Sequence, residues 1–315
     1  MHSRIENNPI LCSSSAAIGR SLDRTVDLQG HRGARGKRPE NTIPAFEYCI
    51  EKQMTSIEID TNVTSDKQLI VNHDTTVNGE ICRSENGVPA EFIPIKDLSV
   101  NELKKLDCGS VRHKEFPEQL PVFGTRLITL TEFFDFVNTY EKNHALSRTI
   151  LFNIETKFRK DYSQRDIRET AGLIVETIAA AGMEKRTTIQ SFVLEVLPEI
   201  RKLNANIKTS ALFEPAWFQT FLLKLGFRAD RDAIIQTTVS IAANILSPHY
   251  CYVNEDFVHQ CHKKCIQVLP WVVNEEKLIE RLLNYGVDGI ISDYPDRLFR
   301  VYSKWSNRVK NTLLR

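Results

Sequence analysis

The chain has 315 residues, of which 42% are hydrophobic and 26% are charged. This composition is typical of a globular protein, and the length allows one large α/β barrel or two smaller domains. The 41 basic and 40 acidic residues give a net charge of +1, which argues against a nucleic-acid-binding protein. No apolar run approaches the roughly 20 residues of a transmembrane span, so we expect no transmembrane segment.

The N-terminal region is polar and contains Pro9, which makes it a poor secretory signal. We predict a flexible leader over residues 1–25 and a single catalytic domain over residues 26–315. We expect a cytoplasmic protein, or a periplasmic or secreted one if a leader was removed. The cysteines are scattered and odd in number, which favours reduced thiols over a disulfide framework. They are Cys12, Cys49, Cys82, Cys108, Cys251, Cys261 and Cys265.

Strand and helix patterns alternate along most of the chain. Strands are predicted at 26–30, 56–60, 150–155, 188–192, 209–213, 244–249, 267–272 and 289–293. A short extra strand, 69–72, follows the second one too closely for a helical crossover and is predicted to form a hairpin with it. Helices are predicted at 43–52, 130–141, 165–181, 193–203, 255–264, 275–285 and 297–313. Eight alternating units indicate an α/β fold, a closed (β/α)8 TIM barrel.

Two segments interrupt this alternation. Residues 75–124 contain loops and one short helix, 97–107, and are predicted to be a small insertion after the second strand. Residues 218–226 are predicted to be an apolar helix or a loop. Asn41 and Thr42 are candidate caps for the helix 43–52, and Thr129 or Thr131 is the candidate cap for the helix 130–141.

Polar side chains lie in or directly after the predicted strands 26–30, 56–60 and 69–72. Glu58 and Asp60 lie two positions apart in a strand, so both side chains face the same side of the sheet. Two adjacent buried carboxylates repel each other and lose hydration, which is costly without a cation between them. We therefore predict that they bind a divalent metal ion. His31 and His73, which follow neighbouring strands, would lie beside it and transfer protons.

A later strand carries a second polar face. Alternation places Asn153, Glu155 and Lys157 on one side of the strand 150–155 and its extension. For this segment alone, a satisfied buried ion pair is the better interpretation. Asn153 is a further candidate for binding metal or substrate. In a TIM barrel the chemistry lies at the carboxyl ends of the strands. Four of the candidate residues fall at such ends: His31, Glu58, Asp60 and Glu155.

Four basic residues, Arg32, Arg35, Lys37 and Arg38, lie within seven positions next to this candidate site. They indicate either a solvated basic loop or attraction of a phosphate-bearing substrate, and the loop alone does not decide between the two.

Taken together and in order, the motifs resemble those of the glycerophosphodiester phosphodiesterase family. They are His31-Arg32-Gly33, Pro39–Thr42, Glu58-Ile59-Asp60, His73-Asp74, Glu155-Thr156-Lys157, Pro270–Asn274 and Gly286–Pro295. The resemblance covers residues 29–296. It implies a TIM barrel that hydrolyses phosphodiesters such as glycerophosphocholine to glycerol 3-phosphate and an alcohol, with Ca²⁺ or Mg²⁺. Two positions depart from the family pattern. Val272 stands where the family usually has Thr, and residues 75–83 lack the usual Leu-x-Arg-x-Thr run.

The resemblance and the residue chemistry together imply roles for the candidate residues. Glu58, Asp60 and Glu155 would bind one divalent cation, since hard cations prefer oxygen ligands. His31 and His73 would act as general acid and base, in an order that the sequence does not decide. Arg32 and Lys157 would neutralise charge on the phosphate, and Trp271, at a strand end, would contact substrate.

Several alternatives remain open at the level of sequence. Zinc binding by Cys251, His259, Cys261, His262 and Cys265 is disfavoured because no C-x-x-C pair is present. The apolar residues from Trp217 to Leu223 form core, a substrate wall or a lipid contact. The basic tail 297–315 is the last barrel helix or a weak membrane-surface helix. A phospholipase C- or D-like activity on lipid phosphodiesters is the alternative function, and a barrel that only binds its ligand is a third. The sequence does not indicate an oligomeric state.

Overall fold

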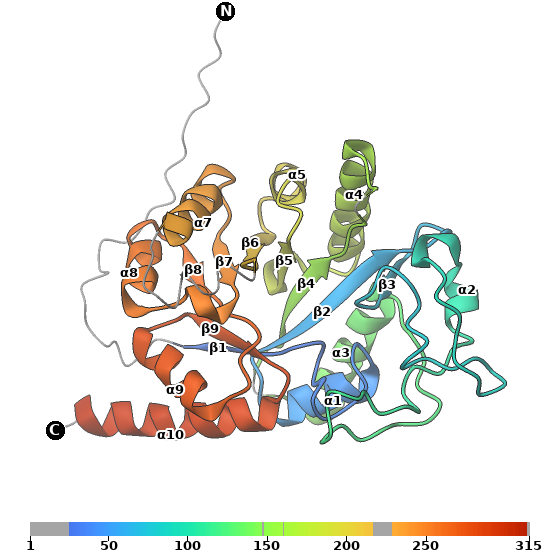
Figure 1. Ribbon diagram of the computed structural model, residues 1–315, viewed down its shortest axis with the longest axis horizontal. Coiled ribbons are helices and arrows are strands. Elements are labelled where there is room, and N and C mark those ends of the chain that lie inside the picture. The colour runs from blue at the N-terminus through green and yellow to red at the C-terminus, as the bar shows by residue number, and fades with distance from the viewer. Residues whose placement is uncertain (1–24, 147, 160, 217–228, 314–315) are drawn as a thin grey trace, which may run out of the picture.

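The computed structural model describes residues 25–146, 148–159, 161–216 and 229–313. The predicted leader, apart from its last residue, lies outside the described residues, as does the segment 217–223. Within the described residues, eight parallel strands form a sheet in the order β8-β7-β6-β5-β4-β2-β1-β9 (Figure 1). They are β1 (Asp27–Gly30), β2 (Ser56–Val63), β4 (Leu151–Thr156), β5 (Thr187–Ser191), β6 (Lys208–Phe213), β7 (Ile245–Pro248), β8 (Gln267–Val268) and β9 (Gly289–Ser292).

The two ends of this sheet are joined by backbone hydrogen bonds just beyond β8. The amide of Asp288 donates to the carbonyl of Val268 at 2.9 Å, and the amide of Ile291 donates to the carbonyl of Pro270 at 3.1 Å. In return, the amide of Val273 donates to the carbonyl of Ile291 at 2.9 Å. The barrel is thereby closed, and the predicted (β/α)8 fold is confirmed. The predicted hairpin is also present, because β3 (Leu69–Val71) pairs antiparallel with β2.

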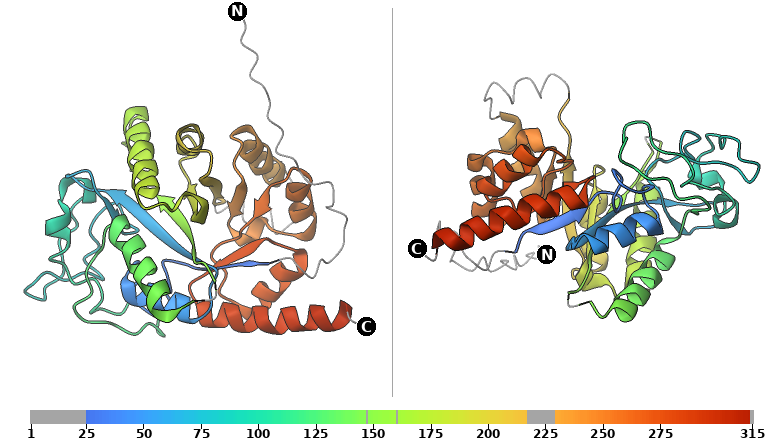
Figure 2. Two further views of the ribbon diagram at one scale, coloured as in Figure 1. Left: turned by 180° about the vertical axis from the view of Figure 1, so that it is seen from behind. Right: turned by 90° about the horizontal axis from the view of Figure 1, so that it is seen from below.

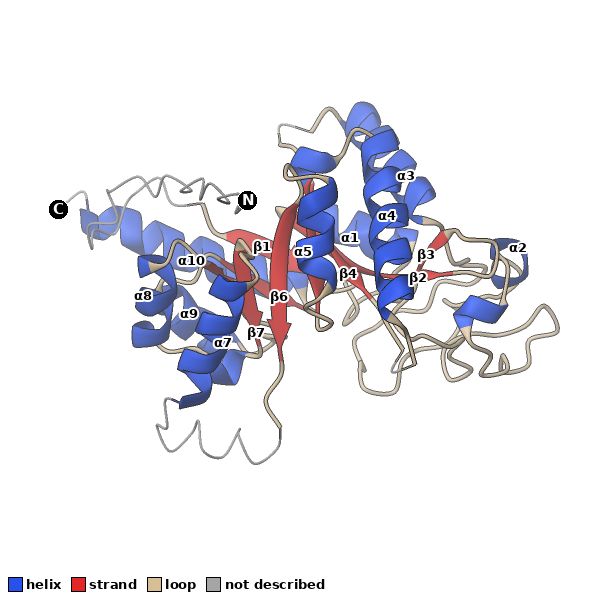
Figure 3. Ribbon diagram, turned by 90° about the horizontal axis from the view of Figure 1, so that it is seen from above, coloured by secondary structure: helices blue, strands red, loops and turns tan. Residues whose placement is uncertain are grey.

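Helices cover the outer side of the strands, as Figures 2 and 3 show from behind, below and above. They are α1 (Ile43–Glu51), α3 (Leu130–His144), α4 (Gln164–Ala180), α5 (Val196–Leu203), α7 (Ala229–Ser240), α8 (Glu255–Lys263), α9 (Glu276–Tyr285) and α10 (Pro295–Leu313), with short turns η2 (Glu184–Arg186) and η3 (Tyr250–Tyr252). The helix α7 was not among the helices predicted from the sequence. Its apolar residues form no continuous stripe, so the periodic signal of a surface helix is absent.

The basic tail forms α10, which packs along α9 at the edge of the barrel (Figure 1). The indole of Trp305 donates to Asn284 at 2.9 Å, and Arg300 pairs with Glu276 at 2.5 Å. These contacts favour the interpretation of the tail as the last barrel helix. Among the described helices, none is both long enough and apolar enough to cross a membrane.

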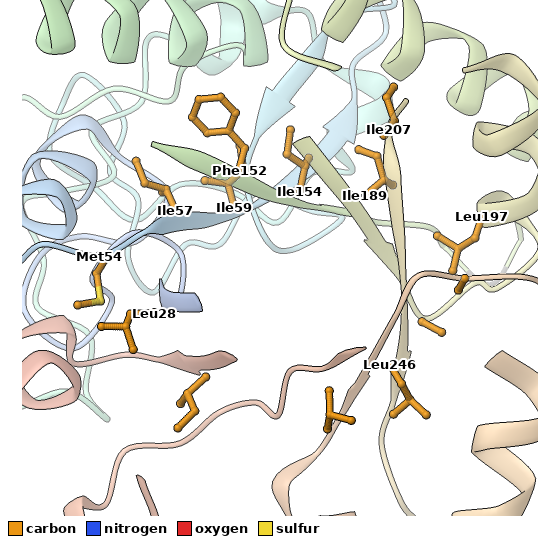
Figure 4. Packing of buried hydrophobic residues seen from close by; sticks show 14 of the residues in the cluster. Leu28, Met54, Ile57, Ile59, Phe152, Ile154, Ile189, Leu197, Ile207 and Leu246 are labelled. Atoms are coloured by element: carbon orange, nitrogen blue, oxygen red, sulfur yellow. The ribbon is translucent and has the colours of Figure 1, made fainter. Parts of the chain in front are cut away.

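The hydrophobic core lies between the strands and the helices. Ile57 and Ile59 on β2 and Phe152 and Ile154 on β4 are buried in it (Figure 4). The intervening residues, such as Glu58, therefore face the inside of the barrel, as strand alternation requires.

Phe133 on α3 is central to this core and is fully buried. Its ring packs edge-on against Phe46 at 4.9 Å and Phe152 at 5.3 Å. We predict that Phe133→Ala destabilises the fold by about 3–5 kcal/mol, because it removes buried ring contacts and leaves a cavity. Urea unfolding would measure this loss against Phe123→Ala, whose side chain is 82% exposed and which should change stability by less than about 0.5 kcal/mol.

The segment between β3 and α3 forms a small structure of its own beside the barrel (Figure 1). It contains η1 (Ile95–Asp97) and α2 (Val100–Leu103), so the predicted helix 97–107 was too long. Its separate apolar cluster includes Ile95 and Leu103. A disulfide joins Cys82 to Cys108, so the expectation of reduced thiols was wrong for this pair. The two cysteines lie 26 positions apart, a spacing without a recognisable pattern, and a disulfide suits a segment whose own core is small.

Candidate active site

Three buried carboxylates converge inside the barrel at the carboxyl ends of β2 and β4. Asp60 and Glu155 are register partners on these neighbouring strands, and Glu58 lies one inward position earlier on β2. One oxygen from each side chain lies within 4.8 Å of the others. Strand alternation predicted that Glu58 and Asp60 share a face, and Glu155 was added to this pair with the family resemblance. The structure brings the three side chains together.

Two basic side chains reach the cluster. Lys157 Nζ lies 2.5 Å from Glu155 Oε1 and 3.0 Å from Asp60 Oδ1. Arg32 Nε lies 3.4 Å from Asp60 Oδ2, which also accepts a hydrogen bond from Asn41 at 2.9 Å. The contact between Lys157 and Asp60 is an ion pair without hydrogen-bond geometry, so Asp60 Oδ1 lacks a hydrogen-bond partner among the described residues. Burial alone would raise the pKa of Asp60, but the charges of Lys157, His73 and Arg32 together lower it well below its usual range.

Glu58 is stabilised by uncharged groups. Its Oε1 accepts from the amide of Gln190 at 2.9 Å, and its Oε2 accepts from the backbone amide of Arg32 at 2.8 Å. Burial, followed by the charges of Asp60 and Glu155, raises the pKa of Glu58 well above its usual range. Burial also raises the pKa of Glu155. Lysine and arginine thus do not fully offset the three acids. An all-oxygen donor set with an orphaned carboxylate oxygen fits a hard divalent cation.

Each candidate histidine is held at Nδ1 by an aspartate. His31 Nδ1 lies 2.6 Å from Asp293 Oδ1, and His73 Nδ1 lies 2.7 Å from Asp74 Oδ1. In both rings Nε2 is therefore the nitrogen that can exchange a proton with a ligand. Burial lowers the pKa of His31, and the Asp293 carboxylate offsets part of that decrease.

The residues that hold these aspartates were missed by the sequence analysis. Asn274 donates to Asp293 Oδ2 at 2.7 Å and accepts from the Asp293 amide at 3.0 Å. Asn78 donates to Asp74 Oδ2 at 3.0 Å. Asn274 and Asp293 lie inside the motifs quoted above, so the motifs contained the signal without indicating the contact. Asn78 lies in the insertion and had no signal.

The basic loop after β1 has a mixed role. Arg32 is buried and pairs with Glu40 at 2.8 Å. Arg35 pairs with Glu40 at 2.6 Å, and Lys37 pairs with Glu118 at 2.5 Å. The remaining cation, that of Arg38, lies over the ring of Tyr48. Of the four cations, Arg32 contacts the carboxylate cluster, whereas the other three make structural contacts.

The conformation of this loop depends on tight backbone approaches. A side chain at Gly30 would meet the carbonyl oxygen of Gly33 at 2.0 Å, and Gly33 itself has a φ of +79°. Asn41, with a φ of +56°, turns its side chain to Asp60 instead of capping α1. Thr42 occupies the cap position but donates its hydroxyl to the carbonyl of Pro39. The predicted caps of α1 therefore serve the loop, whereas Thr129 caps α3 as predicted.

Asn153 lies among inward-facing amides. Its Nδ2 donates to Gln29 at 2.8 Å and to Gln190 at 3.0 Å, and Gln190 in turn donates to Glu58. This row of amides fixes one side of the carboxylate cluster. Trp271 lies at the mouth of the barrel, where its indole donates to the carbonyl of Ser247 at 2.8 Å. The zinc candidates are placed differently: Cys261 is buried in the core, and His262 contacts Asp288 at 2.8 Å.

We predict that Asp293→Asn lowers kcat for phosphodiester hydrolysis, the activity that the resemblance implies, by about 10- to 1000-fold. The protein should remain folded, and the loss should arise because His31 loses its orienting carboxylate. Since the Asp293 charge raises the pKa of His31, its removal should move one limb of the pH–rate profile to lower pH. Movement of the acidic limb would identify His31 as the base, and movement of the basic limb would identify it as the acid. An unchanged kcat and profile would contradict the role of Asp293.

A closed barrel with carboxylates, paired histidines and two buried cations at its carboxyl end defines an enzyme site suited to phosphoryl chemistry. The model of the Glycerophosphoryl diester phosphodiesterase family matches residues 31–297. The chain belongs to this family. It is therefore an enzyme of the phosphoric diester hydrolase class.

Individual relatives agree with this assignment. A glycerophosphodiester phosphodiesterase from Caldanaerobacter subterraneus is 29% identical over 274 residues, covering 87% of this chain and 96% of its own. A putative glycerophosphodiester phosphodiesterase from Bacillus subtilis is 30% identical over 270 residues, covering 86% and 95%. The crystal structure of a putative glycerophosphoryl diester phosphodiesterase from Silicibacter pomeroyi is 26% identical, with a TM-score of 0.78, and covers 90% and 94%.

Proposed function

We propose that the protein hydrolyses glycerophosphodiesters to glycerol 3-phosphate and an alcohol, at a divalent cation held by Glu58, Asp60 and Glu155. The observation that carries the proposal is the convergence of these three carboxylates beside two histidines that are each oriented by an aspartate. Family membership and the relatives named above support the same activity.

In this proposal His31 and His73 move the protons. One imidazole accepts at Nε2 the proton of the attacking hydroxyl, the 2-hydroxyl of the substrate's glycerol, and the other donates a proton to the leaving alcohol oxygen. This step forms a cyclic phosphate and releases the alcohol. Water then opens the cyclic phosphate with the two proton transfers reversed, which gives glycerol 3-phosphate. Asp293 and Asp74 keep the two rings in the tautomer that leaves Nε2 for this exchange. Arg32 and Lys157 face the phosphate and offset the negative charge that grows on its oxygens. When bound, the cation polarises a phosphoryl oxygen.

The cation in this proposal is Ca²⁺ or Mg²⁺. Both prefer carboxylate oxygen, whereas softer metals select imidazole or thiolate ligands. Glu58, Asp60 and Glu155 supply oxygen ligands alone. The Nδ1 atoms of His31 and His73 are already hydrogen-bonded to aspartates and are not free to bind a metal ion.

The test is a coupled assay of glycerol 3-phosphate release with a panel of glycerophosphodiesters, with and without a chelator and with each metal added back. Release of glycerol 3-phosphate that stops with chelator and returns with Mg²⁺ or Ca²⁺ supports the proposal. Cleavage of lipid vesicles without cleavage of glycerophosphodiesters would instead favour the phospholipase-like alternative. Binding of a phosphodiester in calorimetry without turnover would indicate a barrel that only binds.

A further inference from the structure

The second candidate histidine is less enclosed than the first. The side chains of His73 and Asp74 are 32% and 41% exposed, whereas those of His31 and Asp293 are 12% and 6% exposed. An exposed ion pair is weak on its own, because water competes for both groups and both side chains lose conformational freedom. The orientation of the His73 ring therefore depends on what else holds the Asp74 carboxylate.

The contacts of Asp74 come from two different parts of the chain. Its backbone carbonyl accepts hydrogen bonds from Asn62 on β2 at 3.1 Å and from Asn72, which follows β3, at 2.7 Å. Its carboxylate is held from the insertion, residues 75–124, because Asn78 Nδ2 donates to Oδ2 at 3.0 Å. The other carboxylate oxygen, Oδ1, faces His73 at 2.7 Å. The barrel thus fixes the backbone of Asp74, and the insertion fixes its carboxylate.

Asn78 is itself fixed by a tight turn. Its side-chain oxygen accepts from the amide of Glu80 at 2.9 Å, and its carbonyl accepts from the amide of Cys82 at 2.9 Å. Gly79 leaves no room for a side chain in this turn, since a Cβ there would lie 2.2 Å from the carbonyl oxygen of Ala90. The turn therefore sets the direction in which the side-chain amide of Asn78 points.

A disulfide holds this turn within the insertion. Cys82, whose amide closes the turn, is bonded to Cys108, and both lie in the separate apolar cluster of the insertion. The next residues exchange two backbone hydrogen bonds, from Arg83 to Asp107 at 2.7 Å and from Asp107 to Arg83 at 2.9 Å. From the disulfide to the imidazole, three hydrogen bonds of 3.0 Å or less connect the segments in sequence.

We propose that Asn78 is a positioning residue for His73, and that the disulfide between Cys82 and Cys108 keeps Asn78 in place. This inference rests on the proposed function, in which His73 transfers a proton. The insertion then completes the catalytic site, because proton transfer in the transition state needs an imidazole that is held in one orientation.

The variant Asn78→Asp tests the first part at about pH 8, where carboxylates are ionised. It keeps the oxygen that accepts from Glu80 but replaces the group that donates to Asp74 with a second carboxylate. We expect kcat for glycerophosphodiester hydrolysis to fall about 10- to 100-fold with KM nearly unchanged, since a misplaced acid or base weakens the transition state alone. Asn101→Asp, which adds the same charge at an exposed position of the insertion, is the matched control and should leave kcat unchanged.

Replacement of both Cys82 and Cys108 by Ala tests the second part, once circular dichroism shows that the variant is folded. We expect kcat to fall about 2- to 30-fold, the range for residues that act through others. Combined with Asn78→Asp, it should fall no further than in Asn78→Asp alone, because both changes act on His73. Reduction of the unmodified protein by a dithiol, which converts the disulfide to two thiols and is itself oxidised, is a second route. An unchanged kcat in Asn78→Asp or without the disulfide would overturn the inference.

Nitrogen NMR of the histidine rings separates this inference from the proposed function, because it does not depend on turnover. The signals of His73 are identified by their loss in His73→Ala. The unmodified protein should carry the His73 proton on Nδ1, whereas Asn78→Asp should populate both tautomers. That result in a protein that releases no glycerol 3-phosphate would support the inference and refute the proposed function. An unchanged tautomer in Asn78→Asp would overturn the inference.

Discussion

His31→Ala should lower kcat by about 10²–10⁴-fold, because a positioned general acid or base contributes about that factor. His31 is held at Nδ1 by Asp293 at 2.6 Å, and this orientation aims Nε2 into the site. The variant should fold normally, since His31 follows the carboxyl end of β1 and is not a member of the hydrophobic core. Single-turnover and steady-state assays of glycerol 3-phosphate release would measure the loss.

His73→Ala provides the comparison within the same site. Its effect on kcat should be similar in size, because His73 would supply the other of the two proton transfers. Circular dichroism and urea unfolding of both variants would separate lost chemistry from lost folding. Near-native turnover in both variants would refute the mechanism, whatever their stability.

Removal of the divalent cation should lower activity by roughly 10²–10⁴-fold, which corresponds to several kcal/mol of lost charge stabilisation. The metal should also stabilise the fold, by about 2.7 kcal/mol when its concentration is 100 times its dissociation constant. The physical reason is the mutual repulsion of Glu58, Asp60 and Glu155, whose oxygens lie within 4.8 Å of one another. Differential scanning calorimetry in chelator, Mg²⁺ and Ca²⁺ would measure the stability without reference to activity.

Glu155→Gln separates these two effects of the metal. The metal-free variant should be at least as stable as the metal-free parent, because one repelling charge is gone and Lys157 still pairs with Asp60 at 3.0 Å. The same variant should lose much of the metal-induced rise in melting temperature. A metal-induced rise equal to that of the parent would exclude Glu155 as a ligand.

The barrel could be predicted from the sequence because its strands and most helices carry a clear period. The shared face of Glu58 and Asp60 could be predicted for the same reason, since alternation fixes the face of each strand residue. That Glu155 joins them depended on the family resemblance as well. The helix α7 could not be predicted, because two of the buried residues on its inner face, Arg231 and Thr238, are polar and interrupt the apolar period.

Contacts between distant segments were also beyond the sequence. The disulfide between Cys82 and Cys108 depends on how the insertion folds back on itself, and spacing alone does not determine that path. The basic loop after β1 was ambiguous because ion pairing depends on where acids such as Glu118 lie in space. The pairing of His31 with Asp293 joins residues 262 positions apart, so local patterns could not reveal it.

This last pairing has a consequence for biosynthesis. The ring of His31 follows the first strand, whereas its aspartate follows the final strand and is positioned by the closing segment around Asn274. A nascent chain released before this final part has been translated lacks the partner that orients the imidazole. We therefore expect ribosome-bound or prematurely terminated fragments to be almost inert towards phosphodiesters, even if their earlier units have folded. The enzyme would become competent only once its two ends have met.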